Sequence, residues 1–105
     1  MEQPLAKAAA ERIIRHAASL PLGVEYRSHC WERMAQRHVD PLDVVRLLRS
    51  GEVIGIAYRR NGEWRYRVRE RTGNAPADRK RLRVVVVVVT EHRVSCQTVY
   101  RDREG

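Results

Sequence analysis

Apolar residues in the first half of the chain recur every three or four positions, which predicts helices. Residues 4–20 form the first predicted helix, and the turn sequence Pro-Leu-Gly at 21–23 ends it. A second helix is predicted from 28 to 37 or 38, with Ser28 as its N-cap. A third begins at Asp40-Pro41 and ends near Gly51. The expected core residues are Leu5, Ala9, Ile13, Ala17 and Leu20, then Trp31, Met34 and Ala35, and then Leu42, Val44, Val45 and Leu48.

The second half reads as strands separated by turn residues. Four strands are predicted, at 52–60, 63–70, 81–89 and 94–101, with a polar loop at 71–80. Asn61-Gly62 between the first two strands is a strong signal for a tight hairpin. Helices followed by strands predict an α+β domain, in which two or three N-terminal helices pack on a four-stranded, mainly antiparallel sheet.

The six consecutive valines at 84–89 constrain how the sheet is packed. A strand with one face in water alternates apolar and polar residues, but this strand is apolar on both faces. Both faces are therefore expected to be covered. The N-terminal helix, a second copy of the chain in a homodimer, or a partner protein could provide the second layer.

Charge narrows the choice of partner. The 105 residues contain 21 Lys+Arg and 13 Asp+Glu, for a net charge of +8, and only two of the basic residues, at 7 and 80, are lysine. The planar guanidinium group matches phosphate, so this bias favours RNA or DNA as a partner. The alternative is a soluble basic protein encoded by a GC-rich genome.

Other classes of chemistry find little support in the sequence. Cys30 and Cys96 lack metal-ligand spacing, and there is no paired-carboxylate magnesium motif or glycine-rich phosphate loop, so no metal or cofactor is expected. No apolar run reaches membrane-spanning length. Without a signal peptide, a cytoplasmic protein with reduced cysteines is predicted.

The second helix carries the leading candidate for catalysis. His29, Arg33 and Arg37 follow one another in steps of four and so share a face, away from Trp31 and Met34. This face could simply be solvated. Alternatively, the imidazole would take a proton from a ribose 2′-OH, and the guanidinium groups would stabilise the charge that develops on the phosphate.

A second basic row lies on the strand at 63–70, where arginines alternate with Trp64, Tyr66 and Val68. This row either protects a solvent-exposed sheet edge or contacts phosphates. We assign Arg67 to the scissile phosphate. Tyr100 near the end of the last strand either assists catalysis or closes the core with its hydroxyl at the rim. The predicted RNA-binding residues are Arg59, Arg60, Arg65, Arg69 and Arg83.

From about residue 25 to 100 the chain resembles the domain-of-unknown-function 4258 family. The matching stretches are SHCWERMAQRHV, DPLDVVRLLRSGEVI, the valine-rich strand and QTVY. The first contains the family pattern His-x-x-x-Arg-Met-x-x-Arg at His29, Arg33, Met34 and Arg37. Residues 1–22 then form a helical extension, and 23–105 a single toxin-like α+β domain.

The resemblance implies a small toxin of a toxin–antitoxin system, similar in build to RelE-like, MqsR-like and barnase-like ribonucleases. It also implies metal-independent RNA cleavage and an antitoxin partner of the acidic or zinc-finger type. The resulting hypothesis is an endoribonuclease toxin of type II with His29, Arg33, Arg37, Arg67 and Tyr100 in its site. The alternatives are a non-catalytic nucleic-acid-binding module and a protein-interaction domain that uses the valine-rich sheet.

Overall fold

The computed structural model describes residues 1–71, 73 and 80–102. Three helices precede most of the sheet: α1 (Lys7–Ala18), α2 (Ser28–Gln36) and α3 (Pro41–Ser50). The strands are β1 (Val24–Tyr26), β2 (Glu52–Arg60), β3 (Glu63–Arg69), β4 (Leu82–Thr90) and β5 (Arg93–Arg101). The α+β class predicted from the sequence is confirmed.

The sheet has five strands in the order β1-β5-β4-β3-β2, not the four that we predicted. Strands β2 to β5 form antiparallel pairs as expected, whereas β1 pairs in parallel with β5 and makes the sheet mixed. The sequence of β1 is too short to show a strand pattern. Its three residues are extended because they pair with Val94, Ser95 and Cys96, about 70 positions away.

The helix boundaries follow from local hydrogen bonds. In α3, the Asp40 and Asp43 side chains each accept a hydrogen bond from the other residue's backbone N–H, and Pro41 occupies the first turn. In α2 the predicted N-cap is wrong, because Arg27 is the N-cap and Ser28 is the first helical residue. The Arg27 N–H donates to the Cys96 carbonyl at 3.0 Å, so the chain leaves the sheet and enters the helix without an intervening turn.

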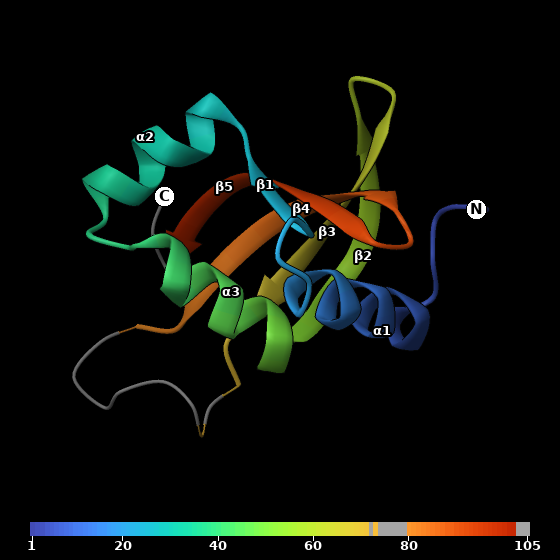
Figure 1. Cartoon of the computed structure of the whole chain (residues 1–105), viewed down its shortest axis with the longest axis horizontal. Helices are drawn as coiled ribbons and strands as arrows, with labels where there is room; N and C mark the ends of the chain where they lie inside the picture. Colours follow the sequence, from blue (N-terminus) through green and yellow to red (C-terminus); the bar gives the residue numbers. More distant parts are fainter. Residues whose placement is uncertain (72, 74–79, 103–105) are drawn as a thin grey trace.

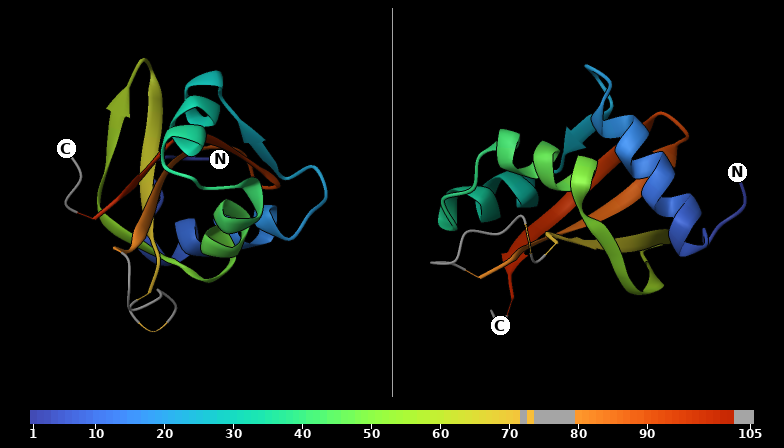
Figure 2. Two further views of the ribbon diagram at one scale, coloured as in Figure 1. Left: turned by 90° about the vertical axis from the view of Figure 1, so that its left-hand side faces the viewer. Right: turned by 90° about the horizontal axis from the view of Figure 1, so that it is seen from below.

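All three helices lie on the same side of the sheet, and the opposite face bears no helix among the described residues (Figures 1 and 2). We call this opposite surface the open face. Between the helices and the sheet lies a single core, to which Cys30 and Cys96 contribute as free, buried thiols. No described helix is long and apolar enough to cross a membrane.

The buried faces of the helices differ in detail from the predicted stripes. In α1, Ala10 and Ile14 are buried in place of Ala9 and Ile13, because two apolar stripes overlap along this alanine-rich helix. In α3, Leu47 is buried and Leu42 is 55% exposed. The remaining buried residues of these two helices are Ala17, Ala18, Val44 and Leu48.

The valine-rich strand is covered on both faces, as predicted, from Val84 to Val88. Its even-numbered valines belong to the core beneath the helices. Val85 and Val87 lie on the open face, yet they are only 4% and 5% exposed. Their cross-strand neighbours there include Arg67 and Arg65, whose aliphatic stems can cover apolar surface while the charged ends reach water. Side chains of the sheet thus replace the second layer that we expected.

Candidate nucleic-acid interface

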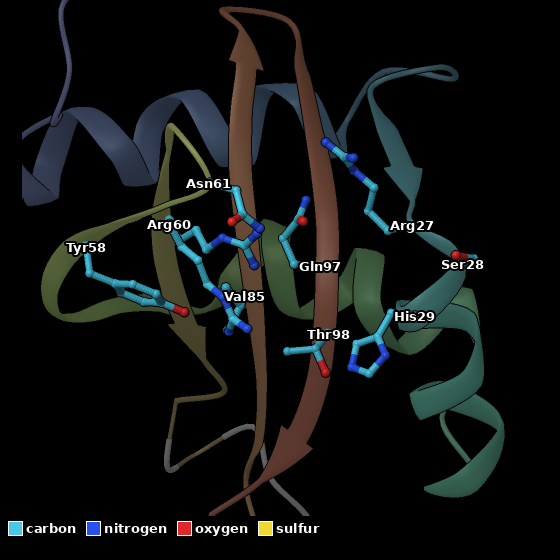
Figure 3. A pocket seen from close by; sticks show the side chains of 10 residues that line it. Arg27, Ser28, His29, Tyr58, Arg60, Asn61, Val85, Gln97 and Thr98 are labelled. Atoms are coloured by element: carbon cyan, nitrogen blue, oxygen red, sulfur yellow. The ribbon is translucent and has the colours of Figure 1, made fainter.

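A hollow of about 470 Å³ opens where the start of α2, the β2–β3 hairpin and the middle of β5 meet (Figure 3). Its volume lies within the range of about 300–1,000 Å³ typical of small-ligand sites. The hollow is lined by Arg27, Ser28, His29, Tyr58, Arg60, Asn61, Arg65, Val85, Gln97 and Thr98. Most of these groups are polar, and three are guanidinium groups, so the hollow is suited to an anion.

A β-bulge in β5 positions Gln97 and Thr98, which form the floor of the hollow. Val85 pairs with Thr98 and Val86 with Cys96, which leaves Gln97 as an extra residue in β5. Cys96 and Val99 both point into the core, so Gln97 and Thr98 are turned toward the open face. Bulges commonly re-aim side chains beside functional sites. A strictly alternating strand would have placed only one of the two here.

Arg27, the N-cap of α2, forms hydrogen bonds with residues of β3 and β5 beside the hollow. Its Nε donates to the Ser95 hydroxyl at 3.0 Å, and one terminal nitrogen donates to Glu63 at 3.2 Å. Gln97 Nε2 also donates to Ser95 Oγ, at 3.1 Å. These contacts connect the N-cap of α2 with β3 and β5. Two of the four participants, Arg27 and Gln97, face the hollow.

His29, the proposed base, lies in the first turn of α2 and lines the hollow on the β5 side (Figure 3). Its Nε2 accepts a hydrogen bond from Arg33 Nε at 3.3 Å, while Nδ1 lies 3.9 Å from a Glu32 carboxylate oxygen. Because a guanidinium can only donate, this contact assigns the ring proton to Nδ1. The lone pair on Nε2 is therefore used by Arg33 in this arrangement.

The rest of the predicted helical row lies outside the hollow. Arg33 also donates to Gln36 at 2.9 Å, and Arg37 is the C-cap, whose carbonyl accepts from Arg101 at 3.4 Å. The prediction that Trp31 belongs to the core is wrong. It is 49% exposed and packs against Tyr26 with ring centroids 4.9 Å apart, because Cys30 and Met34 form the buried side of the helix.

Arg60 and Arg65 are the two predicted RNA-binding residues that line the hollow. Tyr58 is the cross-strand partner of Arg65, and it also lines the hollow (Figure 3). The Nε atoms of Arg65, Arg67 and Arg69 are buried without a hydrogen-bond partner among the described residues, and of these three arginines Arg65 lines the hollow. A buried donor without a partner is costly, so an anion bound here would recover that free energy.

Arg67 is on the open face but is held by its neighbouring strand. Between Ile54 and Tyr58, β2 is irregular, and Gly55 in that stretch has φ +66°. One terminal nitrogen of Arg67 donates to the Ile56 carbonyl at 3.2 Å, and its guanidinium lies 5.5 Å from the centre of the Tyr58 ring. Arg67 does not line the hollow; it supports Tyr58, which does.

Replacing Gly55 with alanine is expected to displace Arg67. A Cβ at this position would lie 2.7 Å from an Arg67 terminal nitrogen, and an L-residue at positive φ is strained. We expect a loss of about 1–2 kcal/mol in the free energy of unfolding, measured by urea denaturation. Gly62→Ala is a matched control for positive φ, since a Cβ added there would meet nothing within 4 Å. Equal NMR shift changes at Arg67 in both variants would contradict this account.

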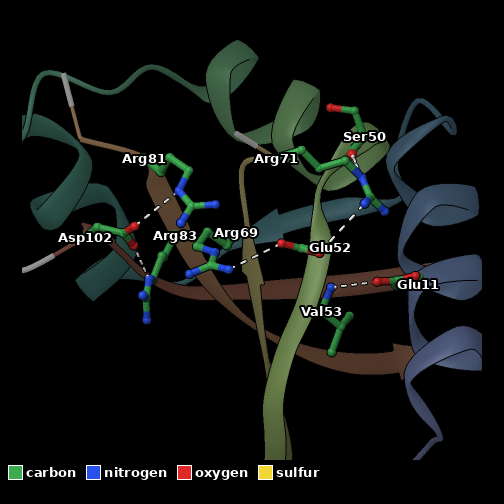
Figure 4. A network of polar contacts seen from close by, with 9 residues as sticks. All are labelled: Glu11, Ser50, Glu52, Val53, Arg69, Arg71, Arg81, Arg83 and Asp102. Carbon is green, nitrogen blue, oxygen red and sulfur yellow. Dashed lines mark hydrogen bonds and ion pairs between the residues drawn. The ribbon is translucent and has the colours of Figure 1, made fainter. Parts of the chain in front are cut away.

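At the far end of the sheet the arginines form ion pairs with carboxylates, two arginines to each carboxylate (Figure 4). Arg69 and Arg71 contact Glu52 at 3.4 and 3.7 Å. Arg83 and Arg81 pair with Asp102. Burial raises the pKa of Asp102, but the hydrogen bond and charge of Arg83 outweigh this effect and hold the pKa below its usual value. Arg69 and Arg83, both predicted to bind RNA, therefore have acidic partners within the chain.

Tyr100 and Arg59 are also away from the hollow. Tyr100 pairs with Arg83 across β4 and β5, and the Arg83 guanidinium lies 5.8 Å from its ring centre. Arg59 lies 5.9 Å from the ring centre of Trp64, which packs against the core. Because Trp64 and Arg65 alternate along β3, Arg59 belongs to the opposite face of the hairpin.

Several residues of the hollow were not selected from the sequence. They are Arg27, Ser28, Tyr58, Asn61, Gln97 and Thr98. The hairpin signal at 61–62 could have pointed to Asn61, which has φ 52°. No sequence pattern marks the bulge in β5 or the junction at Arg27, since both depend on pairing between distant strands.

Within residues 1–71, 73 and 80–102, no group of three or more His, Cys, Asp or Glu side chains is arranged to hold a metal ion. The fold and the hollow thus define a small α+β domain with a basic site on an open sheet face. A family model described as a domain of unknown function (DUF4258) matches residues 26–101, and the chain belongs to this family. No curated protein and no solved structure matches the chain.

Proposed function

We propose that this protein is a metal-independent endoribonuclease that acts as the toxin of a type II toxin–antitoxin system. The observation that supports the proposal is the hollow, whose lining includes His29, Arg60 and Arg65. An imidazole and fixed cations are the groups that phosphodiester cleavage by a 2′-OH requires.

In the proposed reaction, His29 removes the proton from a ribose 2′-OH, whose oxygen attacks the adjacent phosphorus. Arg65 and Arg60 stabilise the charge on the phosphate oxygens as the bond to the 5′-oxygen breaks. The leaving oxygen takes a proton from a hydroxyl or water in the hollow, where Tyr58 and Thr98 offer hydroxyl groups. The products are a 2′,3′-cyclic phosphate and a 5′-OH.

The role of Arg33 in this reaction differs from the predicted one, in which its guanidinium group stabilises the charge on the phosphate. Because Arg33 donates to His29 Nε2, it must withdraw before that nitrogen can accept a proton. The imidazole side chain is 56% exposed, so it can turn without disturbing the core. An incoming phosphate would attract the Arg33 guanidinium and release the imidazole.

The proposal extends to the biological setting. It includes a RelE-like or barnase-like build, supported by three helices that are followed by four antiparallel strands, β2 to β5. It also includes a cytoplasmic RNA substrate and an antitoxin, acidic or zinc-finger in type, that covers the basic hollow. An acidic antitoxin would complement the net charge of +8.

The direct test is incubation of the purified protein with RNA in the presence of a chelator. We expect fragments that end in a 2′,3′-cyclic phosphate, and slower cleavage with Arg65→Ala. Arg59→Ala is the matched control, because it removes the same charge from the opposite face of the hairpin. RNA that stays intact, or equal cleavage by the two variants, would refute the proposal.

A second candidate is RNA binding without cleavage. The contact between Arg33 and His29 Nε2 favours it, because the imidazole is then part of a positive surface and not a free base. This candidate predicts salt-dependent RNA binding that Arg65→Ala weakens, with a logarithmic salt slope smaller by about 0.7–0.9 per lost phosphate contact and no turnover.

A further inference from the structure

Gln97 is one of two polar side chains that are buried in the described part of the chain, the other being Ser95. It is 7% exposed, and the bulge in β5 turns it toward the hollow. Burying a carboxamide is costly unless its donors and acceptors are satisfied. The hydrogen bonds of its amide nitrogen and oxygen therefore influence which ligands the hollow can bind.

The orientation of the carboxamide is fixed by Ser95. Gln97 Nε2 donates to the Ser95 carbonyl at 3.0 Å and to the Ser95 hydroxyl at 3.1 Å. A backbone carbonyl can only accept, so the nitrogen and not the oxygen must face it. Arg27 holds the same hydroxyl from the other side at 3.0 Å, which keeps the arrangement in place.

The other polar atom of the carboxamide, Oε1, receives no hydrogen bond from a described residue, and it is not among the fully buried atoms that lack a partner, so a ligand can reach it. Hydroxyl groups in the hollow, such as those of Tyr58 and Thr98, can turn to donate or to accept. The Gln97 oxygen can only accept, and its direction is set. A phosphate oxygen is also only an acceptor, so the two would repel one another.

We propose that Gln97 Oε1 selects ligands with a hydrogen-bond donor close to the phosphate that Arg60 and Arg65 bind. In a nucleic acid this donor is either the ribose 2′-OH or an N–H group on the edge of a base. The inference rests on the proposed function in one respect, that the ligand is an RNA strand. It adds a polar subsite beside the phosphate subsite and makes the hollow selective for nucleotides over simple anions.

The test compares Gln97→Met with the parent in binding, measured by fluorescence anisotropy. The probes are short homo-oligoribonucleotides of the four bases, their DNA counterparts, and inorganic phosphate as a competitor. All proteins carry His29→Ala so that RNA stays intact. We expect Gln97→Met to weaken binding of at least one RNA about 3- to 10-fold, the equivalent of one hydrogen bond, and to leave phosphate competition unchanged.

The DNA probes separate the two donors. An effect restricted to RNA identifies the 2′-OH, and an effect that persists in DNA identifies a base edge. Gln3→Met is the control, because it makes the same change at a glutamine that lies outside the hollow. Gln97→Ala is measured as well, and it replaces Gln97→Met if thermal melting shows that variant to be unfolded.

Equal affinities for parent and Gln97 variants, an equal loss for oligonucleotides and phosphate, or the same loss in Gln3→Met would each overturn the inference. The readout is binding, so it does not depend on turnover. If the parent protein fails to cleave RNA, the proposed function fails, and the binding comparison still decides the role of Gln97.

Discussion

His29→Ala is expected to lower kcat for RNA cleavage by about 10²- to 10⁴-fold, the usual contribution of a positioned general base. RNA affinity should change little, because the guanidinium groups of Arg60 and Arg65 remain in the hollow. Single-turnover cleavage of a labelled RNA, with affinity measured in parallel, separates the two effects.

His16→Ala is the matched control for this prediction. His16 lies on α1, and its Nε2 is 3.0 Å from His92 Nδ1 at the β4–β5 turn, outside the hollow. This variant should cleave RNA at the parental rate. If His29→Ala also cleaves at that rate, the imidazole is not the base, and binding without cleavage becomes the better description.

Tyr66→Ala is expected to lower the free energy of unfolding by about 3–5 kcal/mol, a large share of the 5–15 kcal/mol typical of a domain. Tyr66 is 1% exposed in the centre of the sheet. Its hydroxyl donates to Gln3 Oε1 and accepts from the Leu5 N–H, both at 2.9 Å. The measurement is urea denaturation at neutral pH.

Tyr66→Phe isolates the hydroxyl, because it keeps the ring and leaves Gln3 and Leu5 without this partner. It should cost only about 1–3 kcal/mol. If the two variants are equally stable, the ring contributes little and the described packing is wrong. Both partners belong to the N-terminal segment, which lies outside residues 26–101 matched by the family model but contacts the same core.

The sequence predicted those parts of the fold that depend on local patterns. Apolar spacing located the helices, the Asp40-Pro41 start placed α3, and Asn61-Gly62 placed the hairpin. The strand β1 and the N-cap at Arg27 could not be predicted, because both arise from pairing with β5. Contacts between residues so far apart leave no periodic trace in the sequence.

For the candidate site, the sequence identified residue types suited to RNA binding and cleavage, but it showed only in part which of these residues lie together in the fold. Helical spacing placed His29 and Arg33 in contact, and alternation placed Arg65 on the open face. The sequence could not show that Arg67 is held by the irregular stretch around Gly55. Nor could it show that the extra residue in β5 turns Gln97 into the hollow.

The distribution of carboxylates on the sheet has a consequence for how a ligand approaches. Glu52 and Asp102 each pair with two arginines at one end, whereas Arg60 and Arg65, at the hairpin end, make no ion pair with a described residue. Positive charge is thus less compensated at the hairpin end than at the far end. A ligand strand that places a phosphate beside Arg60 and Arg65 would therefore be attracted more strongly there than at the far end of the sheet.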